Sequence, residues 1–463
     1  MRIHFEQITA EYPVANVRYC SDGRDDRQNV MMMACAAWAV EAGHEVAVRW
    51  EPAPASAGAV AGADLVFLAL FSVAAYRLQA AVGAARARGA RVVVCGPHAV
   101  SFPEHCLRAG ADAVVGRCNR ALFLRIVADA ERGALQPRYG TDAPVESFPN
   151  HARFRELGLI PEQGFMNALA STGCPYTCAF CSDAEVDYAV QSPSAVARNV
   201  DTGGEPLVIF NDPTLGVGRT GRELLAALAP LENRYFISFT TSSMLRDATF
   251  RRALADAHWL MVEVGIENVN TPFAKNRGAD FAAIFADCDF LVVANYIYGY
   301  DRRDFSDETF LFLAELTARC PNIIPSVFVP FSLPETPLHR DHLAAGSVFD
   351  PSYLCIGNEI LSVRAPGMES PRAYYERLSE LNDRLYEGQI ERIRGWITDH
   401  PRIESPRKDV LLAMLARHER EGDRFDAWVS LVARTAPERF EPFAADVLRA
   451  AVPGFERYGL ALG

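Results

Sequence analysis

Short, wholly apolar segments alternate with helical ones along the first 135 residues, and this alternation leaves few possible folds. Leu65–Phe71 and Arg91–Cys95 are apolar almost throughout, not at every second position. Strands of this kind are buried on both faces, as in a parallel sheet that helices cover. The pattern predicts a doubly wound, Rossmann-like α/β domain of about five strands over residues 1–135. The other strands are expected at Ile3–Phe5, Val46–Arg49 and Ala113–Val115.

The rest of the chain divides into three parts. Residues 136–165 are rich in proline and predict a linker. Residues 166–345 repeat the strand–helix alternation with about six strands, which predicts a partial (β/α)6 TIM-like barrel. Residues 346–463 are predicted to be mostly helical, with Ser370 and Pro371 as the cap and first turn of one helix. The barrel strands are expected at 166–171, Leu207–Asn211, Tyr235–Thr240, Met261–Val264, Leu291–Tyr296 and Ser326–Phe331.

Charge and hydropathy exclude two classes of partner. The chain has 46 basic and 58 acidic residues, a net charge of −12, which argues against nucleic-acid binding. Its longest apolar run, Leu65–Tyr76, is shorter than the roughly 20 residues that span a bilayer, so no membrane association is expected. The first residues lack the apolar core of a signal peptide, which predicts a cytoplasmic protein with reduced cysteines.

The strongest chemical signal is a loop of three cysteines, Cys174, Cys178 and Cys181, just after the first expected barrel strand. Three thiolates at this spacing can hold one face of an iron–sulfur cubane and leave the fourth iron open. A structural zinc site would instead need four ligands, commonly as two short pairs, and no second pair exists in the sequence. The remaining alternative is a chance cluster of buried cysteines.

The string Gly173–Cys181, with Phe180 before the last cysteine, resembles the signature of radical S-adenosylmethionine (SAM) enzymes, in the branch with an N-terminal cobalamin-binding domain. The resemblance covers residues 1–340. It implies a [4Fe-4S] cluster whose open iron binds SAM, and reductive cleavage of SAM to a 5′-deoxyadenosyl radical that abstracts hydrogen. It also implies an electron donor of the flavodoxin or ferredoxin type.

The resemblance extends to the ends of later strands, where barrel enzymes carry their chemistry. Asp212, at the end of the second strand, resembles the acidic strand end of the family and is expected to face the site. Gly265 and Glu267 belong to a Gly-Ile-Glu segment that in the family lies near SAM, and Phe180 joins them as an expected SAM contact. The string 203–206, Gly-Gly-Glu-Pro, matches another family motif but precedes its strand, so it predicts a loop at the wrong end of the barrel.

In the first domain, Ser72, Gly96 and His98 resemble the loops that cradle the nucleotide tail of cobalamin. Small residues there allow close approach of a ligand to the strand ends. The family's Asp-x-His-x-x-Gly string is missing, so no histidine ligand to cobalt is assigned and a domain without the cofactor remains an alternative. His98 is more simply explained as a hydrogen-bonded loop histidine. The other cysteines of this domain are too scattered for a second cluster: Cys20, Cys35, Cys95, Cys106 and Cys118.

The resemblance therefore implies a cobalamin-dependent radical SAM methyltransferase, which we expect to act on an unactivated carbon of a small molecule in specialised metabolism. The main alternative has the same cofactors and no methyl transfer: a cyclisation, ring contraction, rearrangement or epimerisation. A non-catalytic iron–sulfur protein is the alternative from another class. Asp212 and Glu267 argue against it, because a cluster holder needs no SAM pocket.

Overall fold

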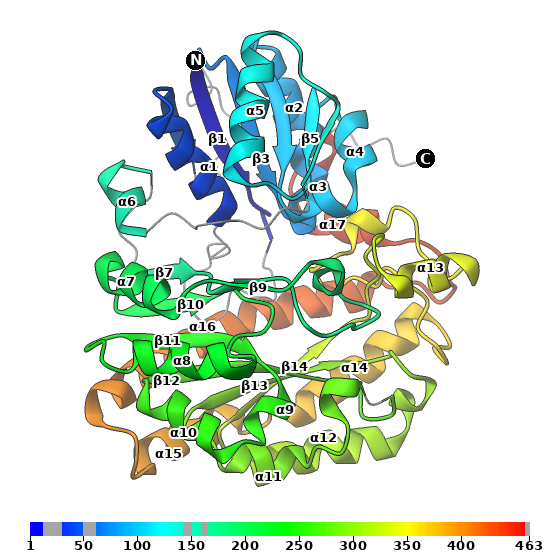
Figure 1. The fold of residues 1–463 in the computed structure, drawn as a ribbon. Helices are drawn as coiled ribbons and strands as arrows, with labels where there is room; N and C mark the ends of the chain where they lie inside the picture. The colour runs from blue at the N-terminus through cyan, green and yellow to red at the C-terminus, as the bar shows by residue number, and fades with distance from the viewer. Residues whose placement is uncertain (13–29, 50–61, 142–150, 160–163, 272, 459–463) are drawn as a thin grey trace.

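The first sheet of the computed structural model is fully parallel and has the strand order β2-β1-β3-β4-β5-β6 (Figure 1). The structure describes residues 1–12, 30–49, 62–141, 151–159, 164–271 and 273–458. The first five strands follow the 2-1-3-4-5 order of doubly wound folds. The six strands are β1 (Arg2–Ile8), β2 (Glu45–Arg49), β3 (Leu65–Leu70), β4 (Arg91–Cys95), β5 (Ala113–Val115) and β6 (Arg138–Tyr139).

Helices cover both faces of this sheet, which explains why its strands are apolar throughout. Alternate residues of β3 belong to two different cores: Phe67 packs with α1 and α5, and Leu68 packs with α2. The doubly wound fold expected from the sequence is thus confirmed. The covering elements are α1 (Val30–Glu41), η2 (Ser72–Arg77), α2 (Leu78–Arg86), α3 (Pro97–Ser101), α4 (Pro103–Arg108) and α5 (Arg120–Glu131).

The segment 136–165 does more than link, which corrects the prediction for it. Its residues Arg138–Tyr139 form β6 at the edge of the first sheet, and the Tyr139 hydroxyl donates to Asp129 at 2.8 Å. Residues 151–156 form α6 (His151–Glu156). Residues 142–150 and 160–163, with Pro144, Pro149 and Pro161, lie outside the described residues.

The second sheet is also fully parallel, with the order β14-β13-β12-β11-β10-β7 and helices between successive strands. Its six strands agree with the partial barrel predicted, although the last begins three residues earlier than expected, because the apolar residues of the preceding turn enter the strand. The strands are β7 (Phe165–Ala168), β10 (Leu207–Phe210), β11 (Tyr235–Thr240), β12 (Trp259–Glu267), β13 (Leu291–Ile297) and β14 (Ile323–Phe328). The helices are α7 (Pro193–Gly203), α8 (Gly218–Leu228), α9 (Ser242–Leu245), α10 (Ala248–Asp256), α11 (Phe281–Ala286), α12 (Asp307–Arg319) and α13 (Pro337–Ala344).

The C-terminal region is helical, as predicted. The Ser370 side chain caps its first helix by accepting from the Ala373 N–H at 3.1 Å. Gly388, with a φ of 64°, separates this helix from the next one. The helices are α14 (Pro371–Tyr386), α15 (Gln389–Asp399), α16 (Ser405–Thr435) and α17 (Ala444–Ala451).

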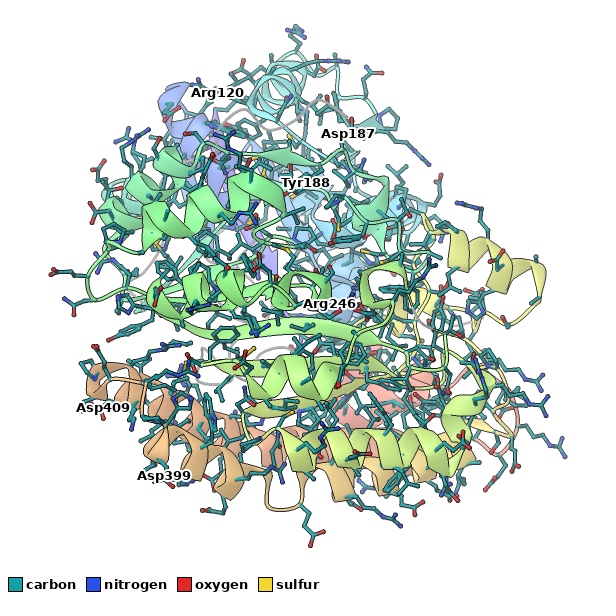
Figure 2. All side chains as sticks on the ribbon, turned by 60° about the horizontal axis from the view of Figure 1, so that its bottom comes forward. Arg120, Asp187, Tyr188, Arg246, Asp399 and Asp409 are labelled. Atoms are coloured by element: carbon teal, nitrogen blue, oxygen red, sulfur yellow. The ribbon has the colours of Figure 1, made fainter. Side chains whose placement is uncertain are left out.

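This region closes the inner face of the barrel from its amino-terminal end. Ile393, Ile397 and Leu411 pack against Met261 and Val293, which start β12 and β13. In Figure 2, Asp399 and Asp409 mark α15 and α16 at the edge of the second sheet. These helices therefore cover the inner face near the amino-terminal ends of the strands.

The C-terminal region also fastens the first sheet to the barrel. Trp428 of α16 stacks on Tyr12, which follows β1, with ring centroids 4.4 Å apart. The Tyr12 hydroxyl donates to the Val73 carbonyl at 2.6 Å and accepts from the Asn358 amide at 3.1 Å. These buried contacts fix how the carboxyl ends of the first sheet face the barrel.

Candidate functional site

The cysteine loop leaves the first barrel strand through a short hairpin. Two antiparallel strands, β8 (Ser171–Thr172) and β9 (Ala189–Val190), bracket residues 173–188. Gly173 begins the loop with a φ of 69°, and a Cβ there would lie 2.5 Å from the carbonyl oxygens of Val186 and Asp187. The sequence needs glycine here because both the backbone conformation and the space exclude a side chain.

The three thiols lie on this loop, partly buried. The Cys174 Sγ lies 3.7 Å from the Thr214 hydroxyl, and the Cys181 N–H donates to the Cys178 carbonyl at 3.1 Å. Burial, then Asp183 and the other two thiols, raise the pKa of Cys181 to about 11. Burial likewise raises the pKa of Cys178. A bound cation that takes the place of the protons would offset the cost of ionising Cys178 and Cys181.

Among the described residues, no three His, Cys, Asp or Glu side chains converge closely enough to hold a single metal ion. Cubane ligands bind separate irons, so they stand farther apart than the ligands of one ion. Three soft, partly buried thiols that act electrostatically on one another fit the donor set of a cubane face.

Asp212 hydrogen-bonds to the residues just before the cysteine loop, so both of its carboxylate oxygens are engaged. It is fully buried, and its oxygens accept from the Ala170 N–H at 3.0 and 3.1 Å and from the Ser171 hydroxyl at 2.5 Å. Burial raises the pKa of Asp212 to about 6, against the effect of these hydrogen bonds. These contacts hold the turn before the hairpin, and the role of Asp212 toward a cofactor stays a prediction.

Glu267 and Lys275 form a buried ion pair at the carboxyl end of β12, beside the cysteine loop. The Lys275 ammonium donates to Glu267 Oε1, and both side chains are at most 14% exposed. Burial opposes the charge of Lys275, yet Glu267 and the thiols of Cys178 and Cys181 raise its pKa. A Cβ at Gly265 would collide with Glu267 Oε1, which explains the glycine.

Lys275 was missed by the sequence analysis, although a signal existed: it is one of only two lysines among 46 basic residues. Tyr300 was missed as well. Its ring packs edge-on against Phe273, with centroids 5.2 Å apart, and Phe180 of the cysteine loop packs edge-on against Phe273 at the same distance. Burial and the Cys178 thiol raise the pKa of Tyr300, so this aromatic group lies beside the thiols.

The string 203–206 lies at the opposite end of the barrel. Gly204 ends α7 with a φ of 78°, and Glu205 pairs with Arg155 at 3.0 Å before β10 begins. The predicted loop begins one residue later than expected, because Gly203 still belongs to α7, and the Glu205 carboxylate is remote from the carboxyl ends of the strands.

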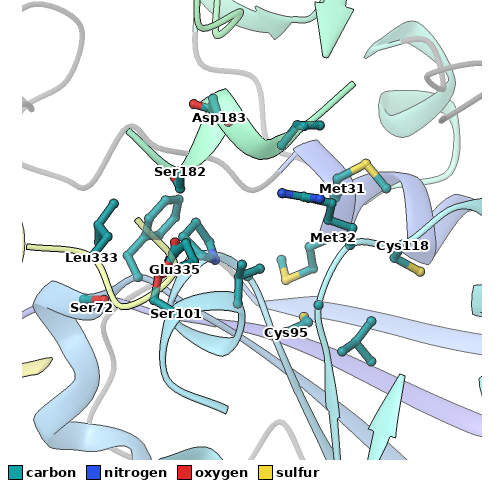
Figure 3. Close-up of a pocket in the computed structure, with 18 of the residues that line it drawn as sticks. Met31, Met32, Ser72, Cys95, Ser101, Cys118, Ser182, Asp183, Leu333 and Glu335 are labelled. Carbon is teal, nitrogen blue, oxygen red and sulfur yellow. Dashed lines mark hydrogen bonds between the residues drawn. The ribbon is translucent and has the colours of Figure 1, made fainter. Parts of the chain in front are cut away.

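A cavity of about 670 Å³ lies between the carboxyl ends of the first sheet and the cysteine loop (Figure 3). Ser72 and Gly96 line it from the strand ends of the first sheet, Ser182 and Asp183 from the segment after Cys181, and Glu335 from the segment after β14. A cavity of this size is in the range of small-molecule and cofactor sites. Its further lining is mostly apolar and rich in sulfur: Met31, Met32, Cys35, Phe67, Phe71, Cys95, Cys118, Phe331 and Leu333.

His98 is not among the residues that line this cavity, and its predicted contact with a cofactor stays a prediction. Its ring is fully buried, with Nδ1 3.0 Å from the Ser72 hydroxyl and Nε2 2.9 Å from His105 Nδ1. Burial, with His105 nearby, lowers the pKa of His98 well below its usual value. His98 orients Ser72 at the wall of the cavity. Gly96, by contrast, lines the cavity with a φ of 93°.

Cys35, Cys95 and Cys118 meet at the cavity from three different elements, which spacing along the chain could not show. A hydrogen bond with Cys118, then burial, raises the pKa of Cys35. Cys20 lies outside the described residues.

Comparison with solved structures shows a likeness in fold to a radical SAM methyltransferase. TsrM from Kitasatospora setae, with tryptophan substrate and a SAM analogue bound, has a TM-score of 0.53 at 13% identity, and the match covers 75% of this chain and 77% of that one. TsrM with cobalamin and a [4Fe-4S] cluster bound has a TM-score of 0.52 at 14% identity, with 74% and 75% covered. These likenesses confirm the fold predicted from the sequence, a Rossmann-like domain followed by a partial TIM-like barrel.

Comparison of sequences gives a weaker relation. An uncharacterized methyltransferase of Synechocystis sp. is 25% identical over 244 residues. The matched region covers 47% of this chain, and the chain spans less than half of that relative, 45% of its length. No family model matches the chain. No helix in the described part of the chain combines the length and the apolar character needed to cross a membrane.

Proposed function

We propose that this chain is a radical SAM enzyme that uses cobalamin to methylate a small molecule. The observation that carries the proposal is the cavity, because it joins the carboxyl ends of the first sheet to the segment directly after Cys181. A ligand held on the first sheet thus lies against the cysteine loop. The likeness to TsrM, a methyltransferase of this chemistry, supports the same conclusion.

Each group of residues has a proposed role. Cys174, Cys178 and Cys181 would hold a [4Fe-4S] cluster, which supplies the electron that cleaves SAM when it is bound. Gly265 and Glu267 would contact SAM, with Phe180 packed beside it. Asp212 would act as a positioning residue for the cysteine loop.

Cobalamin would occupy the cavity, where it supplies the methyl carrier. The small Ser72 side chain and the exposed backbone of Gly96 fit a ligand that approaches the strand ends closely. No histidine stands among the described residues that line the cavity, so this part of the chain offers the cobalt no imidazole. The apolar lining excludes water from a reactive intermediate once the ligands are in place.

The test is anaerobic purification with hydroxocobalamin, followed by measurement of iron, sulfide, cobalt and 5′-deoxyadenosine after reduction. The expected result is about four irons and one cobalt per chain, with deoxyadenosine formed. Four irons and deoxyadenosine without cobalt would favour the non-methylating chemistry, and the mass of a product distinguishes the two, since methylation adds one methyl group. Protein that binds iron but never cleaves SAM would overturn the proposal in favour of a non-catalytic iron–sulfur protein.

A further inference from the structure

The inner face of the barrel is covered near the amino-terminal ends of its strands and accessible farther along them. Ile237 of β11, Met261 of β12 and Leu291 of β13 are register partners, and all three are buried under the C-terminal helices. Two residues farther along β11 and β12, Phe239 is 37% exposed and Glu263 is only partly buried. Phe239 and Glu263 are also register partners, so their side chains point to the same face. The covered part of this face therefore ends just before these two residues.

Glu263 offers one free carboxylate oxygen to this accessible surface. Its Oε2 accepts from the Asn295 amide of β13 at 3.3 Å. Its Oε1 has no hydrogen-bond partner among the described residues and keeps accessible surface. Burial raises the pKa of Glu263 to about 7, against the effect of the Asn295 hydrogen bond. Its register partners on β11 and β13, Phe239 and Val293, carry no charge, so a cation for this carboxylate must come from a ligand.

Gly265 separates Glu263 from the ion pair at the carboxyl end of β12. A Cβ at Gly265 would collide with Glu267 Oε1, so the Glu267 carboxylate, with Lys275 bound to it, lies over the Gly265 position. Residues two apart on a strand share a face and stand about 7 Å apart. A ligand on Glu263 thus lies one step deeper in the barrel than a ligand on the ion pair, which we assign to SAM.

We propose that Glu263 and Phe239 bind the substrate, and that the substrate is an arylalkylamine, in which a short carbon chain links an aromatic ring to an amine. The ammonium donates to Glu263 Oε1, and the ring packs on the exposed ring of Phe239. Neighbouring strands lie about 4.8 Å apart, which suits a ring and an amine that two carbons separate. A carboxylate in place of the amine is repelled by Glu263. This proposal deepens the proposed function and rests on it for the reaction.

The test measures by calorimetry how anaerobically reconstituted protein binds phenethylamine and 2-phenylethanol, which has the same shape without the charge. Glu263→Gln removes the charge but keeps the shape and an oxygen for the Asn295 amide. Phe239→Leu removes the ring. Asn295→Ala is the matched control, because it removes the hydrogen bond to Oε2 and keeps the carboxylate.

Wild type is expected to bind phenethylamine about tenfold more tightly than 2-phenylethanol at pH 8, as one charge-assisted hydrogen bond predicts. Glu263→Gln loses this preference and Asn295→Ala keeps it, whereas Phe239→Leu binds both ligands more weakly. The wild-type affinity for phenethylamine should fall as the pH is lowered from 8 to 6, because Glu263 takes up a proton while the ligand stays cationic. The affinity of Glu263→Gln should stay constant over this range.

Wild-type protein without a preference for phenethylamine would overturn the inference, as would a preference that survives in Glu263→Gln. A variant Glu263→Gln that loses affinity for SAM and keeps the preference would assign Oε1 to SAM and overturn it as well. Iron content and deoxyadenosine formation of the wild type test the proposed function separately, because neither requires the amine.

Discussion

The Lys275 ammonium donates to Glu267 Oε1 at the mouth of the barrel, within electrostatic reach of the thiols of Cys178 and Cys181. A buried pair of opposite charges next to a cluster loop matches the two charges of an amino acid, an ammonium and a carboxylate. We expect the Glu267 carboxylate to bind the ammonium of the methionine part of SAM, and the Lys275 ammonium to bind its carboxylate. Breaking such a pair leaves one charge without compensation.

Glu267→Ala is therefore expected to weaken SAM binding about tenfold or more while iron content stays at the wild-type level. Equilibrium binding of SAM to the reconstituted protein measures this. Glu205→Ala is the matched control, since Glu205 is equally buried and ion-paired but lies at the opposite end of the barrel. Equal affinity in wild type and Glu267→Ala would remove Glu267 from the site, and a loss in Glu205→Ala would restore the string 203–206 as a SAM motif.

Cys178→Ala is expected to lose most of the iron and sulfide that the wild type binds on anaerobic reconstitution, because two thiolates cannot hold a cubane face. Cys288→Ala is the control: its thiol is buried on the other side of the barrel wall and donates to the Ile284 carbonyl at 3.3 Å. Iron and sulfide analysis decides the matter. Iron retained at the wild-type level in Cys178→Ala would contradict the ligand assignment.

Gly173→Ala is expected to reduce iron incorporation and lower the melting temperature. Its Cβ would meet the carbonyl oxygens of Val186 and Asp187, so the loop must shift. Gly218→Ala isolates this clash from backbone strain, because Gly218 has nearly the same φ, 70° against 69°, and open space around it. Both substitutions carry the cost of a positive φ, about 1 kcal/mol, and Gly173→Ala is expected to cost clearly more. Equal melting temperatures would show that the loop adapts without cost.

The raised pKa of Asp212 predicts that the stability of the iron-free protein depends on pH. The folded protein holds its proton up to a pKa of about 6, against 3.8 for the ordinary group. Between these two pH values the folded state therefore binds more protons than the unfolded state. The contribution of Asp212 to the free energy of unfolding is greatest below about pH 4, and it falls by about 3 kcal/mol as the pH rises to about 6.

Asp212→Asn removes this titration. The difference in free energy of unfolding, wild type minus variant, should decrease as the pH rises from 4 to 6.5, and denaturant titrations across that range measure it. A difference that stays constant with pH would show that the carboxyl is ionised throughout.

The fold could be predicted from local patterns in the sequence because those patterns indicate which residues are buried. Leu65–Leu70 is apolar on both faces, and in the structure its two faces contact two separate cores. The cysteine loop was recognisable because its three thiols are neighbours in the chain. The linker was misread because two residues of an edge strand, Arg138 and Tyr139, give too short a pattern to stand out from the prolines around them.

The sequence by itself determined which residues are chemically suited to the site: the thiols, Glu267, and the glycines that open space for them. Only the tertiary structure decided what those residues face. The docking of the two sheets brings Ser101 to Glu335 across 234 positions, turns His98 inward to Ser72, and joins Cys35, Cys95 and Cys118 at one cavity. Such pairings depend on how distant surfaces pack, and no local periodicity records that.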